Sequence, residues 1–500
     1  MLVRSLCALL AALVLCAPSA ARADERGAAA ALARVRSTPP LLRAFLAAMP
    51  KGGDLHNHPD GAVYAERIID WAVADGACVD ATDTLFEPPC ASGASPLAPH
   101  LAASGYRDRL IDALSTREVD KEPISGHDQF FQTFDRFENV ESRHRAQELA
   151  ETTRQAAYDH VSYLELMLTF GGDALTAATQ GVRYDGDLGA LRRGLETDGK
   201  MDRALAQARA QVDALERERR RLLGCDRDSH TAACGVTVRY LMQVIRALPP
   251  ETVFAQTLLG FDLVKSDPLV VGINYVAPED GPVALRDYAL HMRMIAALHA
   301  RDPQVPVTLH AGELTPGLVP PDALQDHIRQ AVEVAGARRI GHGVDVMDER
   351  DPFALLAEMR ARHILVEINL TSNDVILGVR GDAHPFPIYL AHGVPTALST
   401  DDEGVSRIDL THEYVRAVQT YGLGYGTLKT LARNSLEYAF LPGRSLWTSP
   451  SYAQRVAACA VDAVRADHAC AAYLAANPRA AQEWRLEREF AAFEAGYPGR

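Results

Sequence analysis

The stretch "VPVTLHAGE", Val305–Glu313, is an apolar run that ends in side chains capable of chemistry. Five other runs share this form, an apolar segment closed by a polar or glycine-containing turn: "VSYLELML" at 161–168, "VVGIN" at 270–274, "RRIGHG" at 338–343, "HILVEINLTSN" at 363–373 and "VPTALSTDD" at 394–402. Between them lie stretches rich in Ala, Leu, Arg and Glu with a helical period, such as 321–335 and 352–362. Buried strands that alternate with helices indicate a parallel sheet.

The number of such strands favours a closed barrel over an open sheet. An open doubly wound sheet concentrates its ligand residues at one or two strand ends, whereas here they follow at least four strands. In a (β/α)₈ barrel the active site is built where the strands end. We therefore predict an α/β fold, a TIM-type (β/α)₈ barrel with helical insertions and a helical C-terminal tail. The long region 91–136 is expected to hold either a lid or the second barrel strand.

The chain divides into four predicted parts. Residues 1–23 have the features of a secretory signal peptide: Arg4, an apolar run over 5–17, and a small-x-small cleavage site that ends at Ala23. A polar leader is expected over 24–36, the barrel over 37–445 and a helical extension over 446–500. The apolar run is too short for a permanent membrane span, so we expect a secreted or periplasmic protein without a stable membrane anchor.

Charge limits the possible partners. The formal net charge is −14 over 500 residues, and a nucleic-acid partner would require concentrated Lys and Arg. The one dense basic run, Arg217–Arg221, also contains Glu218 and follows Glu216, which is typical of a solvated helix face. We expect a small-molecule partner and no nucleic acid.

Six cysteines remain after removal of the signal peptide, and they fall into three pairs of sequence neighbours: Cys78 and Cys90, Cys225 and Cys234, Cys459 and Cys470. Many pairings are possible for six cysteines, but neighbour pairing is the simplest, and an oxidising compartment favours disulfides. A continuous helix would separate Cys459 from Cys470 by roughly 16 Å, too far for a disulfide. If these two pair, the helix must break between them.

A long helix is predicted over 200–223, where Met201, Leu205, Ala208, Val212, Leu215 and Leu222 form an a/d-type stripe that Arg219 interrupts. Packing on the chain's own barrel is the favoured interpretation. A homodimer contact is the alternative.

A second motif lies in "MPKGGDLHNHPDGAVY", 49–64, where His56 and His58 flank Asn57. Alternate side chains of a strand point the same way, so these two imidazoles aim at one point. His310 and Glu313, His342, and the pair Asp401 and Asp402 close later strands. Imidazole and carboxylate are normal ligands of a catalytic divalent metal, with one position open to water.

Taken together, these segments resemble the adenosine deaminase family of metal-dependent hydrolases, which fold as (β/α)₈ barrels. The order is H-x-H-x-D-G, HAGE, GHG, a Ser-Asn segment and STDD, from Met49 to Leu441. The signal peptide, "MPKG" and the cysteines look more like the secreted, growth-factor-type members, whereas Asp60 and Gly61 follow the cytosolic pattern.

The resemblance implies roles for single residues. One Zn²⁺ per chain would be bound by His56, His58, His310 and Asp401. His342 would accept the proton of the attacking water and orient its oxygen, and Glu313, kept protonated by a raised pKa, would protonate N1 of the purine. Asp402 would bind N7. Asp60, next to Gly61, would hold a ribose hydroxyl, and Asn274 and Ala277 stand where the family contacts the purine.

The implied reaction is hydrolytic deamination of adenosine, or a related 6-aminopurine nucleoside, to inosine and ammonia. An amidohydrolase of the same fold that acts on another amine or amide is the alternative. A non-enzymatic binding or signalling protein would be expected to lack at least one catalytic residue, and none is missing. Cytidine-type zinc deaminases carry a P-C-x-x-C signature, and this sequence has no C-x-x-C.

Overall fold

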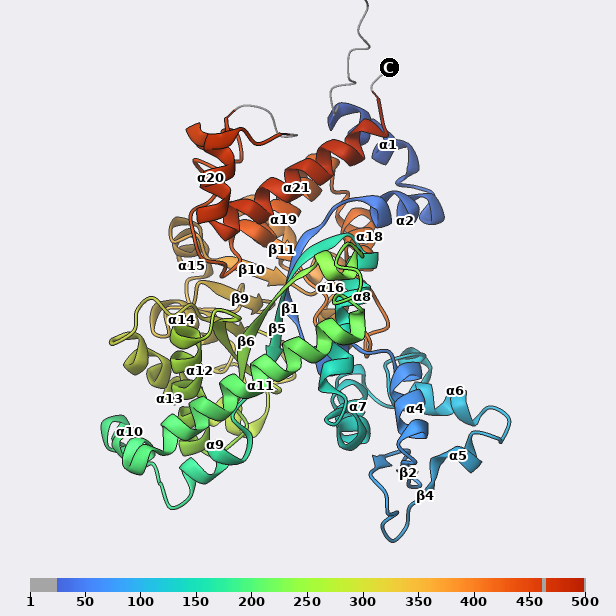
Figure 1. Cartoon of the computed structure of the whole chain (residues 1–500), viewed down its shortest axis with the longest axis vertical. Helices are drawn as coiled ribbons and strands as arrows, with labels where there is room; N and C mark the ends of the chain where they lie inside the picture. Colours follow the sequence, from blue (N-terminus) through green and yellow to red (C-terminus); the bar gives the residue numbers. More distant parts are fainter. Residues whose placement is uncertain (1–24, 461–464, 499–500) are drawn as a thin grey trace, which may run out of the picture.

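The computed structural model describes residues 25–460 and 465–498 (Figure 1). The predicted signal peptide, residues 1–23, lies outside them. Eight parallel strands of the described residues form the centre of the molecule: β1 (Gly52–Asn57), β5 (Val161–Leu168), β6 (Thr237–Ile245), β7 (Val270–Val276), β8 (Thr308–Ala311), β9 (Arg339–His342), β10 (Leu365–Ile368) and β11 (Thr396–Leu398).

These strands close into a barrel. Two four-stranded sheets, β1-β5-β6-β7 and β8-β9-β10-β11, meet at two seams. One seam is the parallel bridge Ile273–Val307, and the other is the bridge Asn57–Asp401. The predicted TIM-type barrel is therefore confirmed, and the second seam lies directly at the predicted ligand residues.

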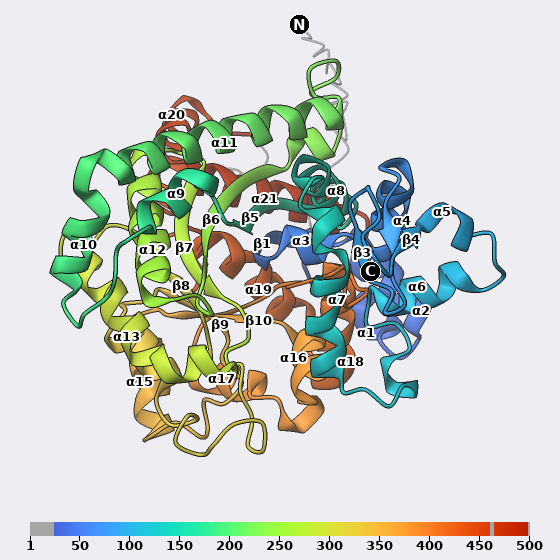
Figure 2. The same ribbon diagram turned by 90° about the horizontal axis from the view of Figure 1, so that it is seen from below.

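Helices surround the strands (Figure 2), and their apolar faces pack on the outward side chains of the barrel. Local signals begin several of them: Pro352 occupies the first turn of α15, while the Asp351 side chain accepts a hydrogen bond from the N–H of Ala354. The helices of the ring are α8 (Arg145–Tyr158), α12 (Pro250–Ser266), α13 (Pro282–His299), α14 (His327–Glu333), α15 (Pro352–Ala361), α16 (Leu370–Leu377), α17 (Phe386–His392), α18 (Leu410–Tyr421) and α19 (Tyr425–Glu437).

The sequence analysis did not single out β6. Its inward and outward positions differ in burial, and the half-buried ones include Arg239 and Gln243. These polar side chains interrupt the apolar run by which the other strands were found, so periodicity alone did not mark Thr237–Ile245 as a buried strand.

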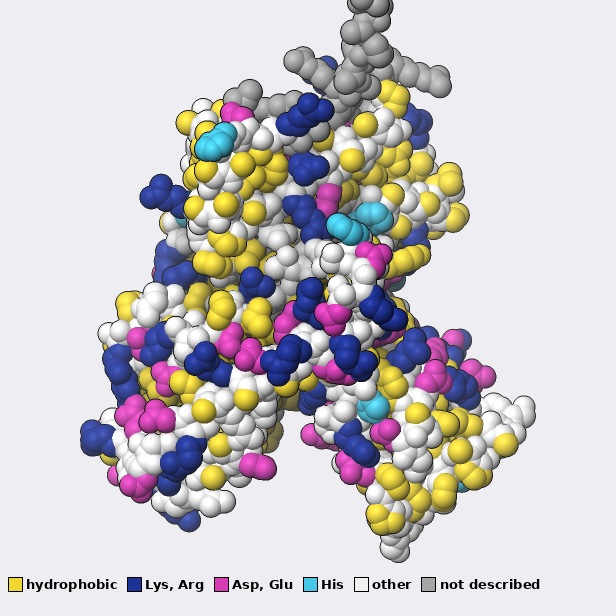
Figure 3. Space-filling model, viewed as in Figure 1, with side chains coloured by type: hydrophobic (Ala, Val, Ile, Leu, Met, Phe, Trp, Pro, Cys, Tyr) yellow, Lys and Arg dark blue, Asp and Glu magenta, His cyan; other side chains and the backbone are white. Residues whose placement is uncertain are grey.

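Residues 59–141, between β1 and β5, form a lobe that projects from the barrel at the lower right of Figure 1 and, in the space-filling view, of Figure 3. It has its own apolar core, which includes Ile68, Leu110 and Phe137. The lobe contains α3 (Pro59–Ala62) at its start, α4 (Ala65–Ala74), α5 (Leu97–His100), α6 (Tyr106–Ala113), α7 (Gly126–Glu141) and the antiparallel strands β2 (Cys78–Val79), β3 (Leu85–Phe86) and β4 (Ser95–Pro96). Region 91–136 belongs to this lobe, and the second barrel strand is β5 instead.

The predicted long helix is confirmed as α11 (Lys200–Leu223), which contacts α8, α12 and α9 (Gly172–Thr179), and α10 (Leu188–Glu196) precedes it. Met201, Ala208 and Val212 are buried against the chain's own helices. Arg219 is only 3% exposed and pairs with Glu216 at 2.7 Å. The stripe therefore tolerates this arginine because a carboxylate on the same helix accompanies it.

The residues expected as a polar leader are instead an ordered helix, α1 (Glu25–Val35), with Ala28, Ala31 and Leu32 buried. Together with α2 (Pro39–Ala48), it packs beside α19 and the C-terminal helix α21 (Pro478–Ala495). The spacing of small apolar residues along 28–32 suits one face of a helix, and composition alone obscured it.

All three predicted disulfides join sequence neighbours: Cys78–Cys90, Cys225–Cys234 and Cys459–Cys470. Between the last two, as expected, the helix is interrupted, since a 3₁₀ turn ends at Cys459 and α20 begins at His468. Within the described part of the chain, no helix combines the length and apolarity that crossing a membrane requires.

A buried carboxylate on α18 predicts a pH-dependent stability. Burial raises the pKa of Glu413 to about 7, although hydrogen bonds from Thr371 oppose this shift. A raised pKa means that the native state binds more protons than the unfolded state between about pH 4.5 and pH 7, so the group's contribution to stability falls as pH rises through this window. Glu413→Gln lacks this titrating group. As pH rises from 5 to 8, we therefore expect its free energy of unfolding to increase by about 2 kcal/mol relative to that of the unaltered protein.

Urea unfolding at several pH values measures the free energy of unfolding of both proteins. The change of this free energy with pH is then compared, so a difference that is the same at every pH does not affect the result. Glu358→Gln, on the surface of α15, provides a control that should show no such change. Parallel pH profiles for Glu413→Gln and the unaltered protein would contradict the prediction.

Candidate active site

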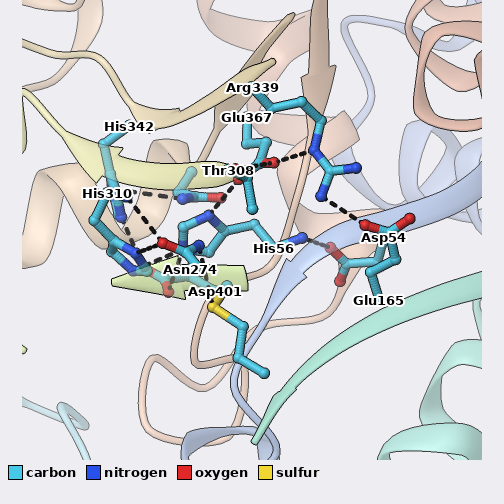
Figure 4. A network of polar contacts seen from close by, with 12 residues as sticks. Asp54, His56, Glu165, Asn274, Thr308, His310, Arg339, His342, Glu367 and Asp401 are labelled. Atoms are coloured by element: carbon cyan, nitrogen blue, oxygen red, sulfur yellow. Dashed lines mark hydrogen bonds and ion pairs between the residues drawn. The ribbon is translucent and has the colours of Figure 1, made fainter. Parts of the chain in front are cut away.

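Four side chains converge at the carboxyl ends of the strands, and Figure 4 shows three of them, His56, His310 and Asp401. The Nε2 atom of His310 lies 3.0 Å from Nε2 of His56 and 3.2 Å from Nε2 of His58. Oδ1 of Asp401 lies 3.3 Å from Nε2 of His56 and 3.4 Å from Nε2 of His58. All four predicted metal ligands are thus brought together, by β1, β8 and the turn after β11.

The partners of the other ring nitrogens fix where each imidazole carries its proton. Nδ1 of His56 lies 2.7 Å from the Glu367 carboxylate, an acceptor, so Nδ1 donates. Oδ1 of Asn274 accepts the backbone N–H of His310 and lies 3.0 Å from Nδ1 of the same residue. Nδ1 of His310 therefore donates too, and both Nε2 atoms present lone pairs to the centre.

These lone pairs and the Asp401 carboxylate would repel one another without a cation among them. Burial alone would lower the pKa of His56, but its hydrogen bonds with Asp401 and Glu367 outweigh burial and raise the pKa to about 10. The surroundings thus favour a positive charge at this point. A divalent metal supplies that charge while it uses the Nε2 lone pairs, so the donor set fits a metal ion.

A buried ion network supports the centre from inside the barrel (Figure 4). Arg339, on β9, donates to Glu367 and to Glu165, each at 2.6 Å. All three side chains are fully buried. Thr308 adds a hydrogen bond to Glu367 at 2.9 Å. The carboxylate that orients His56 is therefore itself held on several sides.

Glu313 lies in a turn that a second carboxylate holds. Glu279 accepts the backbone N–H groups of Gly312, at 3.1 Å, and Glu313, at 2.8 Å, and pairs with Nδ1 of His327 at 2.6 Å. Gly312 has φ of 75°, and a Cβ there would lie 2.5 Å from the Asp345 carboxylate, so the turn requires glycine. Burial, followed by repulsion from Asp401 and Glu279, raises the pKa of Glu313 well above its usual value.

Two site residues adopt the left-handed backbone conformation although neither is glycine: His342 has φ of 69° and Asp401 has φ of 60°. Such strain at strand ends is typical of functional sites. His342 directs Nε2 toward the centre, 3.9 Å from Oδ2 of Asp401. Burial lowers the pKa of His342 to about 3, which keeps this ring neutral.

The residues predicted to bind substrate divide into two groups. Ligand atoms of His58, Asp60 and Asp402 all lie within 4.8 Å of one another. A Cβ on Gly61 would lie 1.8 Å from Oδ1 of Asp402, so only glycine permits this approach. Burial, then the charges of Asp401 and Asp60, raises the pKa of Asp402.

The second group lies behind the centre. Asn274 was predicted to contact a purine, but it is fully buried and its side chain bonds His310 and Met167. Ala277 follows β7 with φ of 85° and is half-buried. Its carbonyl accepts a hydrogen bond from Arg246.

Sequence reasoning did not identify Glu367, Arg339 or Glu279 as part of the site. A signal existed for two of them, since Glu367 and Arg339 are charged residues within runs read as buried strands, and charges are almost never fully buried unless paired. Their partners, however, are far apart in sequence: His56 and Glu367 are separated by 311 residues.

A cavity of about 820 Å³ lies between the lobe and α16, and none of the predicted site residues lines it. The segment 116–127 of the lobe forms one wall, and α16 forms the other, with Glu118, Asp120 and Asp374 among the lining residues. It reaches Ser406, whose N–H bonds the carbonyl of Asp402.

Comparison with known proteins agrees with this architecture. Residues 222–446 match the family model described as "Adenosine deaminase". The adenosine deaminase of Escherichia coli (strain SMS-3-5 / SECEC) is 38% identical over 143 residues, which are 28% of this chain and 40% of that relative. The aligned part thus spans less than half of the relative's length.

Two solved structures share the fold. The N6-mAMP deaminase of Arabidopsis superposes with a TM-score of 0.50 and 20% identity, covering 80% of this chain and 96% of that one. The Arabidopsis ADAL structure complexed with IMP has a TM-score of 0.50 and 20% identity, covering 79% and 93%.

The barrel thus carries a candidate metal site, a cluster of imidazoles and carboxylates at its strand ends. Residues 222–446, which include His310, Glu313, His342 and Asp401, are the part of the chain that is similar to the adenosine deaminase family.

The contact between Asn274 and His310 gives a prediction about metal affinity. Asn274→Leu removes the acceptor for Nδ1–H of His310, and loss of such an orienting partner typically weakens metal binding about 10–100-fold. Asn274→Asp keeps an acceptor oxygen, so we expect its affinity to stay within about threefold. Competition with a chromophoric chelator measures both.

If Asn274 instead contacts the substrate, Asn274→Leu will change KM and leave metal affinity unaltered. That outcome would contradict the role assigned from the hydrogen bond.

Proposed function

We propose that this protein is a zinc-dependent deaminase that hydrolyses adenosine, or a related 6-aminopurine nucleoside, to inosine and ammonia. The observation that supports this most is the convergence of three imidazole nitrogens and Asp401 beside two carboxyl groups with raised pKa values, Glu313 and Asp402. Zinc suits the donor set, since zinc–nitrogen distances of about 2.0–2.1 Å in a tetrahedron place neighbouring ligand atoms about 3.3–3.4 Å apart. Four of the six pairs of ligand atoms here are 3.0–3.4 Å apart.

Zinc bound by His56, His58, His310 and Asp401 would lower the pKa of a coordinated water toward neutrality. The remaining chemistry belongs to the chain's own side chains. Glu313 holds a proton at neutral pH and donates it to N1 of the purine, which makes C6 electron-poor. One water is consumed, oxygen remains on C6, and the former amino group leaves as ammonia.

Asp402 binds N7 of the purine as a hydrogen-bond donor. N7 carries only a lone pair, so a carboxylate could not bind it, whereas a protonated carboxyl can. The raised pKa of Asp402 supports this role, and its Oδ1 has no partner among the described residues. Asp60 would accept the hydrogen bond of a ribose hydroxyl.

A nucleoside suits the ribose end of the site better than a 5′-monophosphate. Arg145 lies 4.0 Å from Asp60, but it also pairs with Glu141 at 2.9 Å and with Glu148 at 3.6 Å. These carboxylates already compensate the guanidinium, so it offers a phosphate no free positive charge. This distinguishes the proposed substrate from the nucleotide named for the Arabidopsis relatives.

We further propose that the protein acts outside the cytoplasm, because the predicted signal peptide and the three disulfides both suit an oxidising compartment. The purine, rather than a partner macromolecule, is the proposed ligand.

Purified mature protein should convert adenosine to inosine, measured as the fall in ultraviolet absorbance and by ammonia release. A chelator should abolish turnover and added zinc should restore it, because all four proposed ligands serve one ion. AMP should be tested in parallel. Its kcat/KM should be at least about tenfold lower, because the charged phosphate of AMP would be buried without a partner. Full metal occupancy without turnover of any 6-aminopurine would favour the alternative, an amidohydrolase with another substrate.

Replacement of Glu313 separates the chemistry from metal binding. Glu313→Gln cannot donate the acid proton, so we expect kcat to fall by about 10²–10⁴-fold while the zinc content measured by atomic emission stays at one per chain. Glu358→Gln serves as the surface control. Near-normal turnover by Glu313→Gln would remove Glu313 from the proposed role.

A further inference from the structure

The Ser-Asn segment of the sequence, Ser372 and Asn373, has no role in the function proposed above. Asn373 lies on α16, is fully buried and contacts the ring of His342. Its Nδ2 atom is 2.9 Å from Nδ1 of His342. Because an amide nitrogen only donates and an amide oxygen only accepts, the orientation of this amide decides which nitrogen of His342 holds the proton.

A chain of buried hydrogen bonds fixes that orientation. The backbone N–H of Phe386 can only donate, and it points to Nδ1 of His384 at 3.1 Å. Nδ1 of His384 is therefore the acceptor, and Nε2 of the same ring carries the proton. Nε2 lies 3.0 Å from Oδ1 of Asn373 and donates to it.

With Oδ1 of Asn373 occupied as an acceptor, its Nδ2 must face His342 and donate to Nδ1. His342 then accepts at Nδ1 and, as a neutral ring, carries its proton on Nε2. Nε2 has no hydrogen-bond partner among the described residues and faces the metal centre. Nδ1 also lies 3.5 Å from Nδ2 of Asn369 and 3.5 Å from Oε1 of Glu313.

We propose that Asn373 and His384 are positioning residues that hold His342 as its Nε2–H tautomer, so that the atom facing the metal centre is a hydrogen-bond donor. This rests on the proposed function for its chemical meaning. A donor at this point stabilises the developing negative charge on an attacking oxygen, whereas the base expected from the family resemblance needs a lone pair on the same atom. Burial also lowers the pKa of His384 to about 4, which keeps that ring neutral and the chain of donors directional.

Two histidines of the proposed ligand set show the opposite arrangement of hydrogen bonds. His56 and His310 each face an oxygen acceptor through Nδ1 and so present a lone pair on Nε2. His342 faces an amide donor instead. The chemistry of the partner, an acceptor or a donor, thus distinguishes a metal ligand from a residue that contacts the reacting oxygen.

Asn373→Asp reverses the tautomer without removing a contact. The carboxylate accepts from Nε2–H of His384, as before, and from Nδ1–H of His342, which moves the lone pair to Nε2. If His342 acts as a donor, kcat should fall by about 10³–10⁴-fold, the effect of a wrong histidine tautomer, with KM and zinc content little changed. If His342 acts as a base, Asn373→Asp should keep or raise kcat.

Nitrogen-15 NMR of histidine-labelled holoenzyme reads the tautomer directly and needs no substrate, so it remains decisive even if adenosine is not turned over. The resonances lost in His342→Gln identify the ring. We expect a protonated Nε2 and an unprotonated Nδ1 in the unaltered protein, and the reverse in Asn373→Asp. A proton on Nδ1 of His342 in the unaltered protein would overturn the proposal.

His384 provides a second test in case Asn373→Asp does not fold. His384→Gln still offers an amide N–H to Oδ1 of Asn373, so the Nε2–H tautomer should persist and kcat should stay within about tenfold. His384→Leu removes the donor and should give a mixture of tautomers. Asn477→Asp, remote at the start of α21, controls for the added charge. Identical NMR patterns in His384→Leu and the unaltered protein would remove His384 from the proposed chain.

Discussion

The site depends on one buried cation, Arg339. Its guanidinium bonds Glu165 and Glu367 inside the barrel, donates to the carbonyl of Tyr438 and lies 3.8 Å from the ring of Phe440. Removing one partner of such a network leaves an uncompensated charge in a medium of low dielectric constant, which is strongly destabilising. The carboxylate of Glu367 is shared between this cation and His56, so the charge balance of the barrel interior and the orientation of a metal ligand are coupled.

This coupling explains why the polar groups lie so deep. An imidazole at a strand end can rotate unless its outer nitrogen is held, and a rotated ring would withdraw its Nε2 atom from the centre. Glu367, on β10, holds His56 of β1, and Asn274, on β7, holds His310 of the neighbouring strand β8. Because strands of a barrel are rigid relative to one another, side chains held in this way are positioned more exactly than side chains on free loops.

The sequence was sufficient to predict the barrel and the atoms that converge in it, since both follow from local patterns: an apolar run, a turn, a histidine or an aspartate. It was insufficient for β6, because Arg239 and Gln243 interrupt the run. It also did not reveal the contact between Asn274 and His310, since these two residues are brought close only by the register of β7 beside β8. Partners that meet only across the barrel leave no periodic signal in the chain.

The two carboxyl groups with raised pKa values give the site a chemical preference. Burial and the charges of Asp401 and Glu279 raise the pKa of Glu313, and burial and the charges of Asp401 and Asp60 raise the pKa of Asp402. In the proposed function each of these carboxyl groups holds a proton, so that together they offer two O–H donors. A 6-aminopurine presents lone pairs at N1 and N7, on either side of C6, and so matches a pair of donors with the reacting carbon between them. A ring that carries N–H at N1 or at N7 would face the O–H of a carboxyl group with its own N–H. Neither donor would then have an acceptor, which leaves a buried polar group unsatisfied. In the proposed function, repulsion among the carboxylates of this centre therefore favours a substrate with acceptors at the positions of N1 and N7.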